Sequence, residues 1–277
     1  MKKFFLVLSV LFISYTGFSQ EEDVDAQSRE SMAVDATATQ WSFQMGYQWM
    51  PDYYQDQLSD GTTRPKGLDN YAQLRIVAPV PLKKLTILPR LTVRHYEDLS
   101  NGKSGFGNTE LFALIIPKFS DWGTGRAGIG PLVTLPGDPN VAKKEWGYGF
   151  AAAVVHNTGN WFLGLLFTQS FRAVDPNALS PEESDVNPLG IAPFVNYRFG
   201  KTGLYVQTAD LVALYDWKSG QIYIPIGGRF GKVWVWEKSS LNLYGEYRTS
   251  MVYKAWPGSA VKNSYRLNVS YTIPIGL

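Results

Sequence analysis

The chain has 277 residues, with 26 Lys and Arg against 24 Asp and Glu, and it contains no cysteine. The lack of cysteine excludes disulfides and a lipid-bearing N-terminal cysteine, and it argues against a small disulfide-stapled secreted domain. Without the two lysines at positions 2 and 3, 24 positive residues face 24 negative ones, so the charge balance gives no indication of nucleic-acid binding.

Two further averages narrow the class of protein. Aromatic residues make up 14% of the chain, which is high for a soluble domain and suits the aromatic girdles of membrane proteins. The mean hydropathy is only −0.15, but lipid-facing and lumen-facing residues of a transmembrane β-strand alternate and cancel in such an average. Beyond the N-terminus no stretch offers about 18 consecutive apolar residues, so no helical span is predicted.

Residues 1–19 have the order of features of a secretory signal peptide. Two lysines form a positive start, residues 4–15 form an apolar run, and Gly17 and Ser19 place small side chains at the cleavage site. Cleavage is predicted after Ser19, with Gln20 as the second choice, so the protein is expected to be exported.

Residues 20–40 are polar, acidic at their start and without a clean period. They predict a flexible periplasmic segment, and a short plug that enters the lumen of the following domain is the alternative. Period-two alternation begins at residue 41 and recurs to the end of the chain. In residues 41–49, Trp, Phe, Met, Tyr and Trp alternate with Ser, Gln, Gly and Gln, which is the pattern of a strand with one apolar and one polar face.

Residues 187–217 read as a strand, a turn with two glycines at 200–203, and a second strand of roughly ten residues. The other strands are predicted near residues 71–78, 85–96, 108–119, 126–135, 145–156, 161–172, 221–234, 241–253 and 264–275. The resulting count of twelve is even, as single-chain bacterial barrels require.

Short and longer connections alternate along the chain, except after the ninth strand, as expected for short periplasmic turns and longer outer loops. We therefore predict an all-β fold, a transmembrane antiparallel up-and-down β-barrel of about 12 strands over residues 41–277, with both termini periplasmic. A soluble β domain or a lipocalin-like shell is the alternative. Tyr265 and Tyr271 make the last strand aromatic and amphipathic, as in bacterial barrels, although the chain ends in Leu277.

Candidate catalytic and metal-binding residues are sparse. The chain has only His95 and His156 and no cysteine, so a structural zinc site is excluded, and no cofactor or catalytic motif is found. Both histidines fall on the apolar register at strand ends, where the plain interpretation is an interfacial polar residue. A lipid-acting hydrolase that pairs histidine with serine is the functional alternative, but no serine motif accompanies either one. Four acids of one loop are candidate calcium ligands or a solvated loop tip: Asp175, Glu182, Glu183 and Asp185.

The inward-facing register of the predicted strands collects charged and amide side chains. Ten of them are predicted to line the lumen: Arg75, Arg90, Arg94, Glu110, Asn196, Arg198, Glu246, Arg248, Arg266 and Asn268. The same register adds Arg126, Glu145, Arg172 and Asn242. Two interpretations stay open. Either these charges pair and fill the barrel, because a buried unpaired charge costs several kcal/mol, or they line a water-filled lumen whose basic stripe favours anionic or aromatic-carboxylate solutes.

From Gly105 onward the chain carries a series of short glycine, proline and aromatic motifs. In order these are GFGNT (105–109) with Pro117, GIGP (128–131) with LP (135–136), WGYG (146–149), NWFLG (160–164), PFVNY (193–197), and IPIGG (224–228) with GKV (231–233). Their order and spacing resemble a broad family of bacterial outer-membrane barrels, named as neuromedin-U-like transporters or as the MetA-pathway of phenol degradation family. Asn108 stands where that family usually has Asp, and Phe150 where a Pro is common, so no site is carried over.

The resemblance implies a barrel with a role in small-molecule passage. The expected function is a channel or transporter of the bacterial outer membrane for small solutes, particularly anionic or aromatic ones, without cofactor or enzymatic activity. The expected partners are outer-membrane lipid, the barrel insertion machinery and a small-molecule solute, with no nucleic acid. A structural or adhesive barrel with a closed lumen and a lipid-acting hydrolase are the alternative functions.

Overall fold

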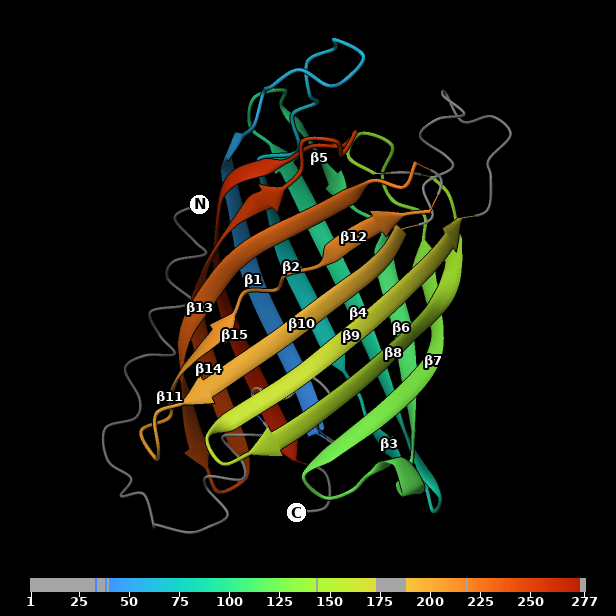
Figure 1. Ribbon diagram of the computed structural model, residues 1–277. Helices are drawn as coiled ribbons and strands as arrows, with labels where there is room; N and C mark the ends of the chain where they lie inside the picture. The colour runs from blue at the N-terminus through green and yellow to red at the C-terminus, as the bar shows by residue number, and fades with distance from the viewer. Residues whose placement is uncertain are drawn as a thin grey trace.

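The computed structural model describes residues 33, 38, 40–142, 144–172, 188–217 and 219–274. These residues form a closed antiparallel β-barrel (Figure 1). Its segments are β1 (Gln40–Tyr53), β2 (Asn70–Val77), β3 (Val80–Pro81), β4 (Leu85–Asp98), β5 (Lys103–Phe106), β6 (Thr109–Pro117), η1 (Lys118–Ser120), β7 (Gly125–Leu135), β8 (Gly147–Thr158), β9 (Trp161–Arg172), β10 (Pro188–Arg198), β11 (Leu204–Thr208), β12 (Ala213–Asp216), β13 (Ile222–Trp236), β14 (Ser239–Val252) and β15 (Val261–Pro274). The predicted signal peptide, the four loop acids and Leu277 lie outside the described residues.

The fifteen strand segments make twelve wall strands, because three wall strands consist of two segments each. β2 and β3 both pair with β4, β5 and β6 pair with the other edge of β4, and β11 and β12 both lie between β10 and β13. The barrel closes where β1 pairs with β15, from Gln40 opposite Pro274 to Tyr53 opposite Val261. The predicted twelve-stranded antiparallel barrel is therefore confirmed.

The first strand shows how the sequence builds the wall. The five large side chains at the odd positions of residues 41–49 are exposed, whereas Ser42 and Gln48 between them are buried. Because side chains alternate across a strand, one set points outward and the other into the barrel. Exposed large apolar side chains recur on the long strands of the wall other than β4, whose outward side chains are half-buried. They form an outer belt of the kind that faces lipid. Within the described residues no helix is long and apolar enough to cross a membrane.

Aromatic side chains meet in clusters near both ends of this belt. At one end the ring of Tyr265 lies 5.5 Å from that of Trp49 and 5.4 Å from that of Tyr247. At the other end the ring of Tyr197 lies 4.8 Å from that of Trp161. These clusters lie where Tyr and Trp gather at the two water interfaces of a membrane protein.

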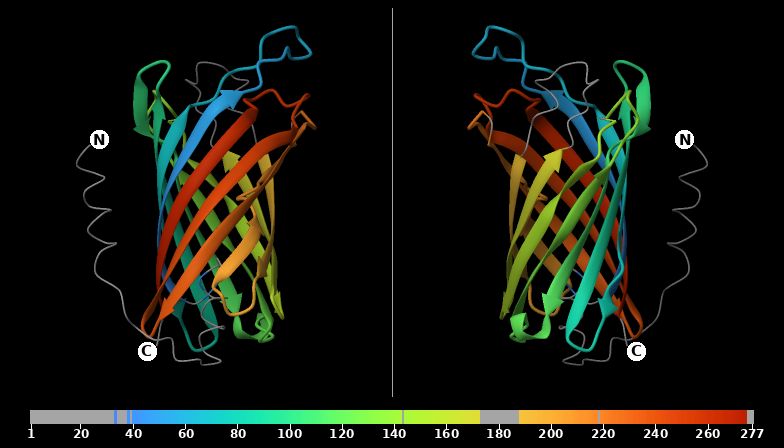
Figure 2. Two further views of the ribbon diagram at one scale, coloured as in Figure 1. Left: turned by 90° about the vertical axis from the view of Figure 1, so that its left-hand side faces the viewer. Right: turned by 90° about the vertical axis from the view of Figure 1, so that its right-hand side faces the viewer.

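The connections differ between the two ends of the barrel (Figure 2). At the short-turn end, tight turns such as residues 199–203 join neighbouring strands. Gly200 and Gly203 of this turn have positive φ angles of 57° and 71°, as the predicted hairpin requires. At the long-loop end, residues 54–69 and 253–260 extend beyond the strands. This alternation confirms the predicted up-and-down order of the chain.

Arg64 ties these two long loops together. Its side chain is buried, and its Nε donates a hydrogen bond to Asp56 Oδ1 at 2.6 Å. Its two Nη atoms donate to the backbone carbonyls of Lys254, Trp256 and Gly258, at 3.0 Å for Lys254 and 3.2 Å for Gly258. The long loops 54–69 and 253–260 therefore form one hydrogen-bonded unit.

Candidate functional site

The inner surface of the barrel has two chemically different regions. The first, here called the apolar cluster, consists of Val77, Leu88, Phe112, Leu114, Ile116, Leu132, Ala151 and Ala153, with Leu166 packed against them. The second, here called the charged cluster, consists of Arg75, Arg90, Arg94, Arg229, Arg248, Arg266, Glu110, Asp210 and Glu246. Seven of these nine charged residues were predicted to line the lumen, whereas the apolar cluster was not predicted.

The apolar cluster exists because β6 is apolar on both faces. Phe112, Leu114 and Ile116 point inward and are buried, whereas Leu111 and Ile115 point outward and are exposed. Inward apolar side chains pack against one another and fill a small barrel from one side. The apolar inner face of β6 and its neighbours was not predicted from the sequence.

The ninth wall strand is interrupted, which corrects the prediction of one continuous strand after the hairpin turn. Asn196 pairs with Gln207 of β11, and Ile191 pairs with Ala213 of β12. Five steps along β10 (196 − 191) therefore match six steps along the ninth strand (213 − 207). An extra residue in one strand makes a bulge that re-aims its side chains. Residues 209–212, here called the strand break, carry this excess and pair with neither neighbour as a ladder.

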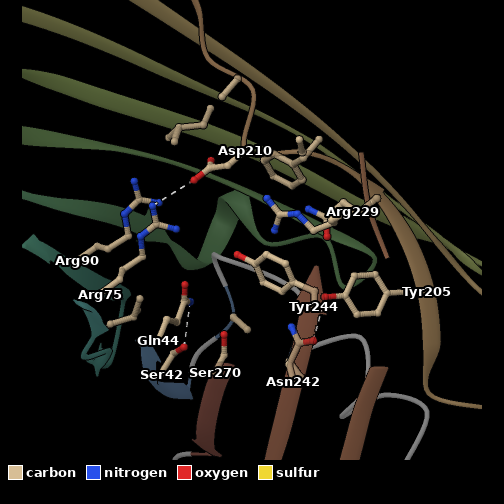
Figure 3. A pocket seen from close by; sticks show the side chains of 18 of the residues that line it. Ser42, Gln44, Arg75, Arg90, Tyr205, Asp210, Arg229, Asn242, Tyr244 and Ser270 are labelled. Atoms are coloured by element: carbon tan, nitrogen blue, oxygen red, sulfur yellow. Dashed lines mark hydrogen bonds and ion pairs between the residues drawn. The ribbon is translucent and has the colours of Figure 1, made fainter. Parts of the chain in front are cut away.

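The strand break holds Asp210 against the arginines of the charged cluster (Figure 3). Its Oδ2 accepts a hydrogen bond from Arg266 at 3.0 Å and one from Arg75 at 3.4 Å. Its backbone N–H donates to Glu246 Oε2 at 3.1 Å, and its carbonyl accepts from Arg248 at 3.4 Å. One residue thus connects the strand break to β2, β14 and β15 across the lumen.

Arg266 uses all three of its guanidinium nitrogens. Besides its bond to Asp210, its Nε donates to Gln48 Oε1 at 2.6 Å, and its Nη2 donates to the Tyr71 hydroxyl at 2.6 Å. The Tyr71 hydroxyl donates in turn to Gln48 Oε1 at 2.9 Å. A buried polar network whose members are satisfied is rigid, so this part of the charged cluster has a fixed geometry.

Two more ion pairs lie in the same cluster. Arg94 Nη1 lies 2.9 Å from Glu110 Oε1, and Arg229 Nη2 lies 2.9 Å from Glu246 Oε2. The cluster contains six arginines and three carboxylates, so its formal charge is +3 (6 − 3). Carboxylates inside the barrel therefore neutralise only part of the arginine charge.

Two of the six arginines make no ion pair with these carboxylates. Arg248 instead donates hydrogen bonds to Ser264 Oγ and to the carbonyl of Asp210. The other is Arg90. Among the described residues it makes no ion pair, and its Nε has no hydrogen-bond partner. Its guanidinium carbon instead lies 4.1 Å from the centre of the Phe112 ring, which is a cation–π contact. Arg90 thus stands at the boundary between the charged and the apolar clusters.

A cavity of about 110 Å³ lies at this boundary. Arg75, Arg90 and Asp210 contribute charged groups to its lining (Figure 3). Leu166 and Phe194 contribute apolar ones. A dry cavity of about 150 Å³ is known to hold benzene. The cavity is smaller than that, so we expect an aromatic ring to enter it only when a lining group moves. Two described residues of the N-terminal segment, at positions 33 and 38, also line it.

The other predicted lumen residues are buried away from Asp210. Asn196 Nδ2 donates to Gln207 Oε1 at 3.2 Å, and Arg198 donates to the carbonyl of Gly159 at 2.7 Å at the short-turn end. Asn268 is buried in β15. Of the wider set, Asn242 accepts a hydrogen bond from Tyr205, Arg126 lies in β7, Glu145 precedes β8, and the side chain of Arg172 is outside the described residues.

Two members of the charged cluster, Asp210 and Arg229, were missed by the sequence reasoning. The alternation of β13 identifies Arg229 as inward once its neighbour Phe230 is assigned to the outer surface, where it is exposed. No periodic signal identifies Asp210, because this residue lies where the period of the strand fails.

The two histidines lie on the outward register of the wall. The ring of His95 packs edge-on against Phe106 at 5.1 Å, and His156 Nδ1 accepts a hydrogen bond from Trp122 at 3.4 Å. Neither contact involves a serine. Within the described ranges no three His, Asp or Glu side chains gather as ligands for a metal ion.

Comparisons with known proteins bear on the fold. No family profile and no curated protein match the chain. Among solved structures it is similar to the COG4313 outer membrane channel from Pseudomonas putida F1, with 16% identity and a TM-score of 0.59 over 85% of this chain and 95% of that one. The fold is that of outer-membrane β-barrels. Outer membrane phospholipase A from Escherichia coli is less similar, with 11% identity and a TM-score of 0.45 over 84% of this chain and 92% of that one. At such identities the likeness shows the fold and neither solute nor reaction.

Proposed function

We propose that this barrel is an outer-membrane channel or transporter for small amphiphilic anions, in which a carboxylate is joined to an aromatic or aliphatic body. The observation that carries the proposal is Arg90, an arginine without an ion-pair partner among the described residues, at a cavity that apolar side chains also line. A guanidinium binds a carboxylate through two parallel hydrogen bonds. The apolar lining offers the matching surface for the body of such a solute.

The charge of the lumen supports the same class of solute. The charged cluster carries a formal excess of three positive charges inside a low-dielectric wall. A narrow path lined by one sign of charge raises the local concentration of counter-ions and repels ions of its own sign. Anions are therefore expected to enter the barrel more readily than cations.

The comparisons support a channel role, because the Pseudomonas putida structure with this fold is described as an outer-membrane channel. The motifs from Gly105 onward support membership of the neuromedin-U-like barrel family as a further part of the proposal. The proposal also keeps the expected setting: export by a signal peptide, outer-membrane lipid and the barrel insertion machinery as partners, and neither nucleic-acid binding nor catalysis.

The decisive experiment is conductance of the purified, refolded barrel in a planar bilayer under a potassium chloride gradient, because the reversal potential reports ion selectivity. We expect steady conductance with a preference for chloride. Arg90→Gln should weaken that preference, since it removes a positive charge from the cavity. The matched control is Lys232→Gln, because Lys232 lies on the outer register over the ring of Trp234, and this change should leave the preference unaltered.

Benzoate provides a second measurement in the same bilayer. It should reduce the chloride current of the unmodified barrel more than that of Arg90→Gln, because the carboxylate competes for the Arg90 guanidinium. A barrel shown to be folded that conducts nothing, or that prefers potassium, would contradict the proposal.

One observation favours a closed structural barrel as the second candidate. The bonds of Asp210 to Arg75 and Arg266 cross the lumen, and the apolar cluster fills part of it. If this candidate holds, the folded barrel stays silent in the bilayer, and Asp210→Asn produces conductance by releasing the strand break. The function would then lie in the outer loops joined by Arg64.

A further inference from the structure

The hydrogen-bonded wall of the barrel is interrupted beside the strand break. Along β10, residues 192–195 have no ladder partner in the ninth strand. Along β13, residues 224–227 have none either, apart from one bond from the N–H of Ala209 to the carbonyl of Gly227 at 3.2 Å. Unpaired strand edges are costly in contact with lipid. A break of this length is therefore expected only where the sequence provides for it.

Along β10, the backbone N–H groups that would face the break are either bonded to a side chain or replaced by proline. Thr208 Oγ1 accepts a hydrogen bond from the N–H of Val195 at 3.1 Å and donates one to the carbonyl of Pro193 at 3.4 Å, so both backbone groups face the break. In an antiparallel strand the N–H and C=O of one residue point to the same neighbour. Position 193 thus carries a proline where an N–H would have faced the break.

On the other side of the break, β13 also carries a proline where a backbone N–H would lack a partner. The carbonyl of Gly227 faces Ala209, so the residue two positions earlier, Pro225, lies on the same edge of β13. Proline again stands where an N–H would have had no ladder partner. Two prolines and one threonine hydroxyl together show that the interruption is specified by three separate strands.

The cavity reaches the wall at this point. Its lining includes Leu211 of the strand break, Ala192 on the inner face of β10, and Pro193, which is exposed on the outer face. Because the carbonyl of Pro193 faces the break, the cavity borders the interrupted ladder at this strand. On the other side, the cavity residue Gln44 lies in β1, whose ladders to β15 and β2 are continuous around it.

We propose that the strand break is a lateral passage through which the apolar body of a small amphiphilic carboxylate moves between the cavity and the membrane. The proposal rests on the proposed function for the charge of the solute and on the interrupted ladder for its route. Arg90 holds the carboxylate inside the barrel, and Leu211 and Phe194 contact its apolar body. Leu211 and Val212 move aside while Asp210 keeps its ion pairs, since the cavity is smaller than one known to hold benzene. The N–H of Leu211 donates to a carbonyl within the strand break and not to a neighbouring strand.

The absence of cysteine makes a direct test possible. Single cysteines carrying the fluorophore bimane are placed at Leu211→Cys in the strand break, at Gln44→Cys in the same cavity behind a continuous wall, and at Ile129→Cys on the lipid-facing surface, where Ile129 is 58% exposed. Each labelled barrel is inserted into vesicles of phosphatidylcholine with or without brominated acyl chains. Bromine quenches bimane only on close approach.

We expect loss of fluorescence in brominated lipid at positions 211 and 129 and none at position 44. Position 211 without quenching, while position 129 is quenched, would overturn the lateral passage. Equal quenching at positions 44 and 211 would overturn it as well, because lipid would then reach the cavity without using the strand break.

A flux measurement separates this inference from the proposed function. The bulky reagent benzyl methanethiosulfonate is attached to Leu211→Cys, and entry of 2-naphthoate into barrel-containing vesicles is compared with chloride conductance in a planar bilayer. We expect naphthoate entry to fall to less than half while chloride conductance and anion preference are retained. An unmodified barrel that does not conduct, or that shows no preference for anions, would instead contradict the proposed function, whatever the quenching result. Unchanged naphthoate entry with intact conductance would contradict the lateral route alone.

Discussion

Hydrogen bonds between specific partners hold the charged cluster together, whereas close contact between side chains of β2 to β9 holds the apolar cluster together. In the charged cluster, Asp210 and Arg266 each bind several partners, so the loss of one leaves the others with fewer hydrogen bonds inside the barrel. In the apolar cluster, the loss of a side chain such as Leu114 leaves only a void. The two regions therefore respond differently to substitution although they share one lumen.

The difference also shows what each region offers a solute. The satisfied part of the charged cluster is rigid and has little capacity left for a new anion. Arg90 stands apart, because its guanidinium rests on the Phe112 ring and contacts the cavity. Binding capacity thus lies where the two regions meet, and stability lies within each of them.

The largest expected effect comes from breaking the hydrogen-bonded region. Arg266→Met removes the cation that binds Asp210, Gln48 and Tyr71. Removing one partner of a buried ion pair typically costs about 3–5 kcal/mol, because the other charge stays buried without compensation. Urea-induced unfolding in lipid vesicles, followed by tryptophan fluorescence, measures the loss.

Arg266→Lys is the control for this substitution. It keeps the charge near Asp210 but lacks the planar guanidinium that reaches three partners, so an intermediate loss is expected. A loss below about 1 kcal/mol for Arg266→Met, the range of an exposed ion pair, would show that the network does not hold the barrel together.

A smaller effect is expected from opening a void in the packed region. Leu114→Ala should lower the free energy of unfolding by roughly 3 kcal/mol, because a fully buried leucine in a packed cluster is lost. The matched control is Ile115→Ala on the outward face of the same strand, where lipid fills the space and the loss is smaller. Equal losses at the two positions would show that the interior of the barrel is not packed as a core.

Much of the fold follows from alternation along single strands. The pattern of residues 41–49 indicates a wall strand with an apolar outer face, and the same pattern places Arg75 and Arg94 inward. Alternation is a local property, so it reports the face of each residue but not its partner across the lumen. Asp210 and Arg75 are 135 residues apart in the chain, and no local pattern connects them.

The ninth strand shows why the position of Asp210 was not predictable from the sequence. Before the break the odd-numbered Tyr205 is buried, and after it the even-numbered Asp216 is buried, because one extra residue reverses the faces. Val206 and Trp217 are exposed on the corresponding outer faces. The extra residue is visible only against the register of the neighbouring strands. The prolines at positions 193 and 225 mark it, but on strands other than its own.

The long loops permit a comparison with the lumen, since Arg64 is as buried as Arg266 but binds mainly carbonyls. Arg64→Met leaves the carbonyls of Lys254 and Gly258 without their donor. An unsatisfied buried acceptor costs roughly 1–3 kcal/mol, and the loss should be confined to the loops. Hydrogen exchange should speed up in residues 54–69 and stay unchanged in β14. Faster exchange throughout the barrel would contradict a local role.

The smallest effect concerns pH. The hydrogen bond from the Arg64 guanidinium lowers the pKa of the Asp56 carboxyl in the same loop. Because the folded pKa lies below the unfolded one, this stabilisation of the loop is complete above the ordinary pKa of about 3.9 and is lost as the pH falls through the folded value. Bimane on Ser59→Cys should therefore keep its anisotropy between pH 8 and pH 5 and lose it only in stronger acid. Asp56→Asn should abolish this acid transition. The control Asp60→Asn, whose carboxylate binds Thr62 instead, should keep it, and a transition that survives Asp56→Asn would assign the effect to another group.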